Sequence, residues 1–268
     1  MDIQQYYKKY AEISLNASIA ACIPPFFILI IWLVVDHKLP ILVMTLPFMV
    51  YSFFCYQNYL VGKRRYEEAA ENSLESNRSE SFIESNDMLI AFLPAPSLRM
   101  LLFAPSGKLI GEVKDLRFWK WRWFLPYFMD RLFPGMYGLY NDKGELTAQI
   151  HLGNGKDGFI KIYENDELLG FYIRIENDQL SDLKGEFVLG DEEKMFCAIR
   201  SELNGEMRFY DQTGKTVCGL KKGWMPLEWG KYFRDPNTPI LSFHHQSRKE
   251  EKIAVISFLV QCYCYRNH

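Results

Sequence analysis

The 268-residue sequence lacks an excess of charge of either sign. Lysine and arginine together number 31, aspartate and glutamate number 33, and the formal net charge is −2. Proteins that bind nucleic acid usually carry a clear positive excess, so this balance argues against nucleic acid as a partner. Apolar residues make up 49% of the chain, which excludes a chain disordered throughout.

The sequence also lacks the motifs of common catalytic and metal sites. Its six cysteines include no C-x-x-C pair, so neither a zinc ribbon nor a dense disulfide framework is indicated. There is no P-loop, no G-x-S-x-G nucleophile elbow and no H-E-x-x-H pair. The run 153–158 (GNGKDG) matches G-x-G-x-x-G, but a dinucleotide site needs a helix after it, and the following residues alternate like a strand. We interpret this run as a turn, and we expect no cofactor and no enzymatic activity.

Charge is missing altogether from two long stretches near the start of the chain, 13–35 and 39–62. A bilayer core needs about 20 helical residues, and both stretches are long enough. A signal peptide would have a shorter apolar region with no second one directly after it, and a buried core hairpin would seldom run so far without charge. The sequence therefore predicts a two-span transmembrane hairpin with a charged stalk over 1–70. Because no ionisable side chain lies inside either span, we interpret the hairpin as an anchor rather than a transport path.

Basic residues indicate how the hairpin is oriented. Five of them flank the outer ends of the two spans: Lys8, Lys9, Lys63, Arg64 and Arg65. The turn between the spans carries only Lys38. Since lysine and arginine favour the cytoplasmic side, we expect a multi-pass protein of the cell membrane with both termini in the cytoplasm.

Beyond the stalk the composition changes twice. Residues 71–87 are rich in Ser, Asn and Glu and poor in apolar residues, which predicts a flexible linker. Over 88–268, short apolar segments alternate with turn signals. The predicted strand pairs are 99–104 with 108–113, 136–140 with 145–152, 158–163 with 168–175, 185–189 with 194–200, and 206–210 with 216–220. Strands of this length, joined by such turns, favour an antiparallel barrel or sandwich.

The end of the chain, 252–265 (KIAVISFLVQCYCY), has 13 residues without charge after its lysine. The stretch is short for a third membrane span, and its Val, Ile, Phe and Tyr would suit a final strand. A helix that is apolar all round is a buried helix, and an antiparallel barrel can enclose one. Of these three interpretations we favour the enclosed helix, over about 250–266.

A run of hairpins with D/N-x-G turns, closed by one apolar C-terminal helix, resembles the tubby C-terminal-like superfamily. That group includes tubby, the phospholipid scramblases and the LURP-one-related proteins. The resemblance covers roughly residues 96–268 and implies a twelve-stranded antiparallel barrel around a central hydrophobic helix. This sequence departs from tubby in its two N-terminal spans, and tubby's basic phosphoinositide-binding residues have no matching positions here. A membrane-anchored bacterial relative is the nearest comparison.

One stretch, 116–133 (LRFWKWRWFLPYFMDRLF), mixes aromatic and basic residues, and we expect it to be an insertion in the barrel. Three of the six tryptophans of the chain fall inside this stretch, within the five consecutive residues 119–123. Its candidate contact residues are Arg117, Trp119, Lys120, Trp121, Arg122, Trp123 and Arg131. Trp and Tyr favour the headgroup region of a bilayer, and basic side chains there gain about 1 kcal/mol each from anionic lipid. The same residues could instead pack on the barrel through cation–π contacts, or bind a protein.

The sequence thus yields three functional hypotheses. In the first, a non-enzymatic membrane protein holds a cytoplasmic barrel that binds or senses anionic lipid headgroups of the inner leaflet. In the second, the barrel is a tethered scaffold or regulator that binds a protein partner through the tryptophan-rich stretch. The third, a lipid scramblase activity, rests on the fold resemblance alone.

Overall fold

The computed structural model describes residues 1–34, 38–71, 81–95, 97–117, 135–153, 159–174, 185–189, 193–200, 206–211, 213–223, 225–244 and 247–264. The chain divides into two compact units, Met1–Ser73 and Leu74–His268. A long apolar helical region forms the first unit, and a large antiparallel sheet forms most of the second.

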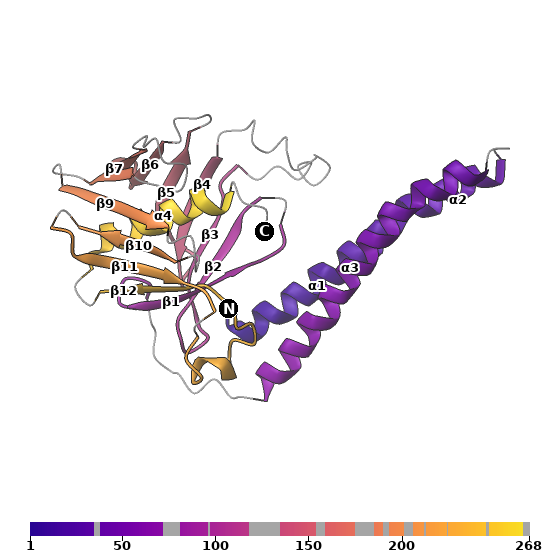
Figure 1. Cartoon of the computed structure of the whole chain (residues 1–268), viewed down its shortest axis with the longest axis horizontal. Helices are drawn as coiled ribbons and strands as arrows, with labels where there is room; N and C mark the ends of the chain where they lie inside the picture. Colours follow the sequence, from indigo (N-terminus) through magenta and orange to yellow (C-terminus); the bar gives the residue numbers. More distant parts are fainter. Residues whose placement is uncertain are drawn as a thin grey trace. The chain divides into compact units, whose positions relative to one another are not determined.

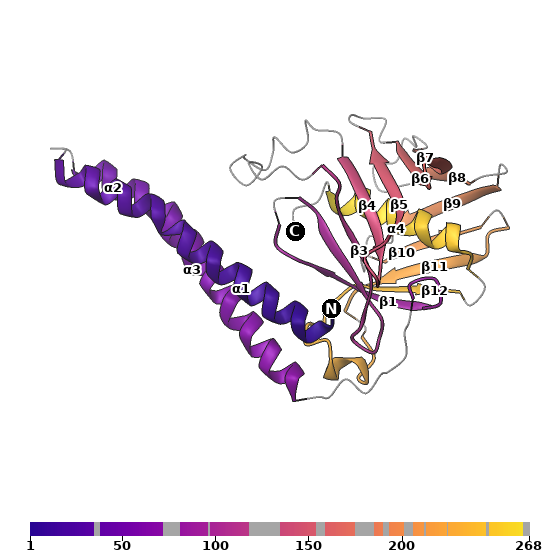
Figure 2. The same ribbon diagram turned by 180° about the vertical axis from the view of Figure 1, so that it is seen from behind.

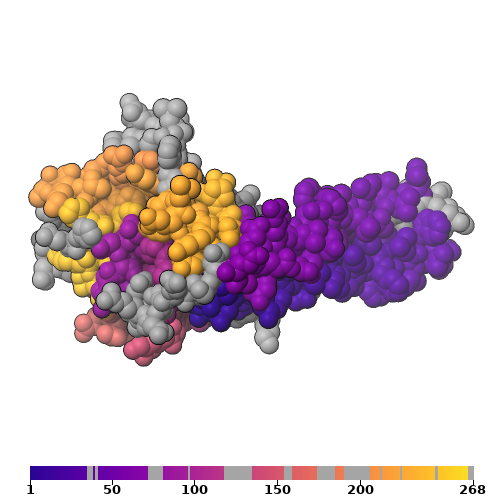
Figure 3. Space-filling model, turned by 90° about the horizontal axis from the view of Figure 1, so that it is seen from below, coloured from indigo at the N-terminus to yellow at the C-terminus, as the bar shows by residue number. Residues whose placement is uncertain are grey.

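The helical unit consists of α1 (Ile3–Ala21), α2 (Ile23–Val34) and α3 (Lys38–Ala70). Asp2 caps α1, because its side chain accepts a hydrogen bond of 2.7 Å from the backbone N–H of Gln5. The two prolines Pro24 and Pro25 fall in the first turn of α2, where a missing N–H costs little. In the space-filling view the indigo α1–α2 leg and the purple α3 leg lie against each other along their length (Figure 3).

Small residues bring the backbones of α1 and α3 close together. The hydroxyl of Ser18 donates to the carbonyl of Ser52 at 3.0 Å, and the hydroxyl of Ser52 donates to the carbonyl of Ser18 at 3.0 Å. A Cβ added at Gly62 would lie 3.2 Å from the Cβ of Ala11, so this position has no room for a larger residue. Small residues and paired hydroxyls at the contact are typical of helices that associate within a membrane.

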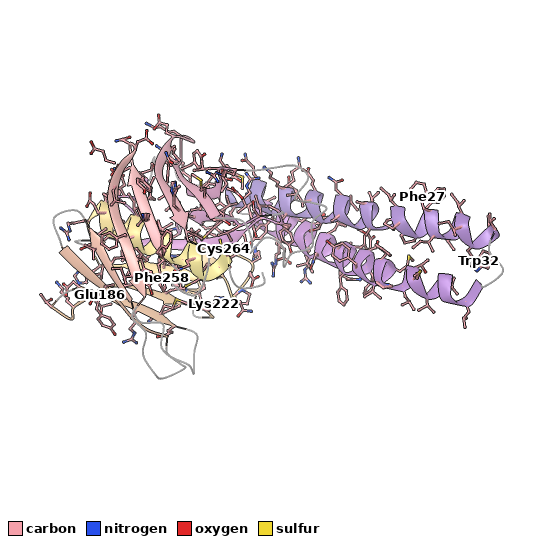
Figure 4. The ribbon with its side chains drawn as sticks, turned by 90° about the horizontal axis from the view of Figure 1, so that it is seen from above. Phe27, Trp32, Glu186, Lys222, Phe258 and Cys264 are labelled. Atoms are coloured by element: carbon pink, nitrogen blue, oxygen red, sulfur yellow. The ribbon has the colours of Figure 1, made fainter. Side chains whose placement is uncertain are left out.

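The outer surface of the helical unit is apolar. Strongly exposed side chains include Phe26, Phe27, Leu33, Leu39, Met44 and Phe54. Figure 4 shows Phe27 projecting from α2. One helical segment among the described residues, Ile3–Val34, is long and apolar enough to cross a membrane by length and composition. The second predicted span, 39–62, lies within α3.

The second unit is a sheet of antiparallel strands. Their bounds are β1 (Asp87–Phe92), β2 (Arg99–Phe103), β3 (Leu109–Asp115), β4 (Gly135–Asn141), β5 (Leu146–Leu152), β6 (Ile160–Glu164), β7 (Glu167–Arg174), β8 (Gly185–Leu189), β9 (Glu193–Arg200), β10 (Met207–Tyr210), β11 (Thr216–Lys221) and β12 (Ile240–Phe243). Each strand pairs with its neighbours in sequence, and β1 also pairs with β12, so the hydrogen-bonded order closes on itself (Figures 1 and 2).

Three of the hairpin turns are built alike. In each, a glycine takes a positive φ: Gly107 at 83°, Gly144 at 80° and Gly214 at 78°. Each glycine N–H donates to the carbonyl three residues earlier, and the strand register shifts beside the turn. This is the three-residue hairpin with a bulge, for which glycine is the favoured residue at the left-handed position.

Helix α4 (Lys249–Cys264) lies inside the ring of strands, as both ribbon views show (Figures 1 and 2). Every side chain from Lys252 to Val260 is buried. The ring of Phe258 lies 5.3 Å from that of Tyr172 and 5.7 Å from that of Phe209, and both contacts are edge-on. Tyr172 is on β7 and Phe209 is on β10, so two separate parts of the wall contact this ring. A helix without a polar face is covered on all sides here, and this packing forms the main core.

The two ends of this barrel differ. We call one the turn end, because the short turns 104–108, 141–145 and 211–215 lie there, and we call the opposite end, where the connection 116–134 leaves the wall, the loop end. Helix α4 begins at the turn end, where Lys249 pairs with Glu164 of the β6–β7 turn. It ends at the loop end, where the ring of Tyr263 lies 4.7 Å from that of Phe92.

Two expectations about boundaries need correction. The linker predicted over 71–87 is too long, because Phe82 is 1% exposed within the main core and Asp87 already begins β1. The run is mostly polar, so its composition did not indicate that Phe82 would be buried in the core. The barrel predicted over 88–268 therefore begins before Met88. The helix predicted over about 250–266 spans Lys249–Cys264 among the described residues.

The Phe258 cluster generates a stability prediction. Phe258→Ala should lower the free energy of unfolding of the barrel by about 3–5 kcal/mol, because it removes buried surface and leaves a cavity among fixed rings. Chemical unfolding followed by circular dichroism measures this. Leu168→Ala, at a side chain 51% exposed, is the control and should change the value by no more than about 0.5 kcal/mol. Equal losses in the two variants would contradict the placement of α4.

Candidate functional site

The aromatic–basic stretch 116–133 is attached to the barrel at the loop end. Its first residue lies beside β4, because the backbone N–H of Leu116 donates to the carbonyl of Met136 at 2.9 Å. Of the predicted contact residues, Arg117 is described, and it is exposed. Trp119, Lys120, Trp121, Arg122, Trp123 and Arg131 lie outside the described residues. The structure thus gives the point from which the stretch leaves the wall.

A histidine and a lysine lie beside that point. Met136 pairs across the sheet with His151, and His151 pairs with Lys161, so the three form one row over β4, β5 and β6. Burial lowers the pKa of the His151 imidazole, and the positive charges of Arg117 and Lys161 lower it further. Strand register puts Lys161 beside His151, and the hydrogen bond from Leu116 to Met136 brings the neighbouring Arg117 to the same row. We call Arg117, His151 and Lys161 the basic cluster.

Aromatic rings accompany the basic cluster. The Nζ of Lys161 lies 5.5 Å from the ring centre of Phe159, which is 43% exposed. The ring of His151 lies 4.8 Å from that of Tyr163. The mixture of aromatic and basic residues seen in 116–133 therefore continues onto β5 and β6, which are distant in sequence.

One nitrogen of the His151 imidazole makes no hydrogen bond to the described residues. This nitrogen, Nε2, is buried. A buried polar atom without a partner is costly, and an anion that accepted a hydrogen bond from this nitrogen would remove that cost. Bound negative charge would also favour the imidazolium form.

The neighbouring basic residues are already engaged. Lys114 places its Nζ 4.0 Å above the ring of Tyr140, and Arg99 pairs with Glu112 at 2.6 Å. Burial raises the pKa of the Tyr140 hydroxyl, and the charge of Glu112 raises it further. These contacts hold β2, β3 and β4 together on their outer face. The basic cluster is thus the part of this surface better suited to an external anion.

Nothing in the described residues resembles a metal centre, since no group of three or more His, Cys, Asp or Glu side chains comes together there. The basic cluster is flanked by the rings of Phe159 and Tyr163 and by one carboxylate, that of Asp115, whose Oδ1 accepts a hydrogen bond of 2.8 Å from the backbone N–H of Arg117. Its chemistry suits attraction and hydrogen bonding of anions.

The predicted membrane-flanking residues lie in the helical unit. Lys8 and Lys9 are on α1, and Lys63, Arg64 and Arg65 are on α3. The side chain of Gln4 donates to the carbonyl of Ala69 at 2.9 Å, so the two helices pair antiparallel and all five cations fall at one level. Arg64 also pairs with Glu68 at 2.8 Å, four residues along α3, a spacing that stabilises helices modestly.

The sequence identified Arg117 but missed His151 and Lys161. Each stands alone in its own strand, and only the register of β4, β5 and β6 brings them to the foot of the aromatic–basic stretch. The available signal was alternation, since both residues occupy outward positions between buried ones. The alternation of buried and exposed residues shows which face of a strand a residue occupies. It does not show which residue of the next strand lies beside it.

Comparisons with known proteins give little guidance. No family model matches the chain, and no curated protein matches it. Among solved structures, the X-ray structure of a protein from Arabidopsis thaliana is similar to 67% of this chain and to 91% of its own, with 13% identity and a TM-score of 0.41. That degree of similarity is too low to assign a family.

The basic cluster predicts how His151 titrates. Lys161→Met should raise the pKa of the His151 imidazole, because it removes one of the charges that oppose protonation. A pH titration of the imidazole signals by NMR measures this pKa. Lys114→Met, which removes a cation on β3, should leave it unchanged. If the two substitutions moved the pKa of His151 equally, Lys161 would not belong to the cluster.

Because the pKa of His151 is lowered in the folded chain, the sign of its effect on stability follows. The unfolded chain binds the proton more readily, so the folded state loses stability as the pH falls through the ordinary histidine range. Lys161→Met should weaken this acid sensitivity.

Proposed function

We propose that this protein is a membrane-anchored, non-enzymatic module whose barrel contacts anionic lipid headgroups through its loop end. The observation that carries the proposal is that the chain enters the aromatic–basic stretch at Leu116 and Arg117, beside the row of His151 and Lys161. Arg117 and Lys161 supply positive charge, His151 supplies a hydrogen-bonding imidazole, and Phe159 supplies an exposed ring. Trp and Tyr with basic neighbours are the residues that the bilayer interface favours.

The distribution of acidic residues supports the same orientation. Carboxylates gather in the short turns at the opposite end of the barrel: Asp142, Glu145, Glu164, Asp166, Glu167 and Asp211. An anionic membrane repels that end and attracts the basic cluster. The anionic phosphates of the inner leaflet are therefore the ligand class that fits the loop end.

For the anchor we propose two membrane spans. If the segment Ile3–Val34 crosses the bilayer, α3 must lie at the same depth, because Ser52 bonds to Ser18 and Gly62 lies against Ala11. The exposed surfaces of both legs are apolar along this depth. The five flanking cations at one level favour the cytoplasmic side for both ends of the hairpin.

For the fold family we propose a tubby-like barrel. Its support is the closed antiparallel order of β1 to β12 around a buried C-terminal helix. The fold alone does not imply scramblase chemistry, and the proposed role rests on the loop end.

The two-span topology predicts a labelling pattern. In a chain whose native cysteines are replaced, His37→Cys should react with an impermeant maleimide in intact cells. Leu227→Cys, at a side chain 96% exposed on the barrel, should react only after permeabilisation. Reaction at position 227 in intact cells would place the barrel outside and overturn the orientation.

The lipid contact predicts a charge-dependent fluorescence effect. In the full chain carrying Trp32→Phe, reconstituted in nanodiscs, brominated lipids should quench tryptophan more in anionic than in neutral bilayers. The substitutions Arg117→Ala, Lys120→Ala and Arg122→Ala together should abolish the difference, because each cation contributes about 1 kcal/mol near anionic lipid. Added salt should reduce it in the parent.

The matched control removes the same charge at the turn end: Lys108→Ala, Lys143→Ala and Lys215→Ala. These substitutions should leave the quenching as it is in the parent. Quenching that is insensitive to both triple substitutions, or equally sensitive to them, would contradict lipid contact at the loop end.

A further inference from the structure

Residues 81–86 close the turn end of the barrel, although they precede its first strand. Phe82 is 1% exposed and belongs to the same core cluster as α4. The segment is folded on itself, since the backbone N–H groups of Glu84 and Ser85 both donate to the carbonyl of Ser81 at 3.1 Å. Ile83, next to Phe82, is 42% exposed. The segment is therefore a cap with one aromatic side chain inserted into the core.

A buried lysine of α4 holds this cap. Lys252 is 2% exposed, and its ammonium donates to the carbonyl of Ile83 at 2.5 Å and to that of Ser85 at 2.8 Å. It also lies 5.4 Å from the ring centre of Phe243. A buried charge is tolerated only where polar groups replace its water, and here backbone carbonyls of the cap do so. The helix and the cap are thus joined by the hydrogen bonds of one side chain.

The wall beside this lysine contains a buried thiol. Cys218 of β11 is 0% exposed and belongs to the core cluster. It pairs across the sheet with Phe243, whose ring centre lies 5.4 Å from the ammonium of Lys252. Asp87, the first residue of β1, faces the same region and accepts a hydrogen bond of 2.6 Å from the hydroxyl of Ser242.

We propose that residues 81–86 are a lid that opens independently of the barrel wall, with Lys252 as its latch. In the sequence, the lid lies between α3 and β1. Its contacts include the buried ring of Phe82, the two hydrogen bonds from Lys252, and a backbone hydrogen bond of 2.7 Å from the N–H of Phe243 to the carbonyl of Asn86. The strands of the closed ring are instead hydrogen-bonded along both edges, so the lid has a lower local stability than they have. Opening exposes the turn end and the thiol of Cys218. This inference does not depend on lipid contact at the loop end.

The test is hydrogen exchange on the full chain in nanodiscs. Lys252→Met keeps the length of the side chain but removes the bonds to the lid, so the amides of residues 81–86 should exchange at least about tenfold faster. Amides of β4 and β5 should keep their rates. Lys249→Met, one turn earlier on α4, removes a contact to Glu164 instead and should not affect the lid.

A second pair of variants tests the lid from its own side. In a chain with Cys218 as its single cysteine, Phe82→Ala should speed maleimide labelling of the thiol at least about tenfold. Its neighbour Ile83→Ala should label at the parent rate. Unchanged lid exchange in Lys252→Met would overturn the proposal. Equal acceleration across lid and wall would also overturn it, because the segment would then open only with the whole barrel.

Discussion

The rest of the structure depends on the burial of a helix that has no polar face. From Lys252 to Val260 α4 presents no side chain to solvent, so a wall must surround it on every side. The antiparallel strands provide that wall by turning alternate residues inward, and β1 meets β12 to close it. Because the ring of strands is closed, every connection between strands lies at one of its two ends. Helix α4 runs from the turn end to the loop end, and the two ends carry different residues.

The functional asymmetry of the barrel follows from that assignment. Tight turns with glycine at positive φ gather carboxylates at the turn end, while the connection with the tryptophans leaves from the loop end. The wall then adds His151 and Lys161 to the foot of this connection through strand register. The turn end also carries Lys108, Lys143 and Lys215, so the two ends differ in their balance of charge. An anionic surface can orient such a domain without a deep pocket.

The sequence predicted those parts of the architecture that depend on a few neighbouring residues. It did not predict the parts that depend on contacts between distant segments. The turns around Gly107, Gly144 and Gly214 were recognisable because their chemistry is contained within a few residues. The four-residue β12 and the lid around Phe82 carry too few apolar residues to stand out. At the candidate site, Arg117 was visible within a dense aromatic–basic run. His151 and Lys161 were not, because neighbours across a sheet depend on register, which no single strand encodes.

The central claim is that the loop end lies at the membrane surface and the turn end lies in water. Spin labels at Phe159→Cys and Lys143→Cys, on opposite ends of the barrel, test it most directly in the full chain in anionic nanodiscs. Power saturation should find the label at position 159 accessible to oxygen and shielded from a water-soluble relaxing agent. The label at position 143 should be accessible to the water-soluble agent and less accessible to oxygen. Two labels equally exposed to the aqueous agent would contradict it.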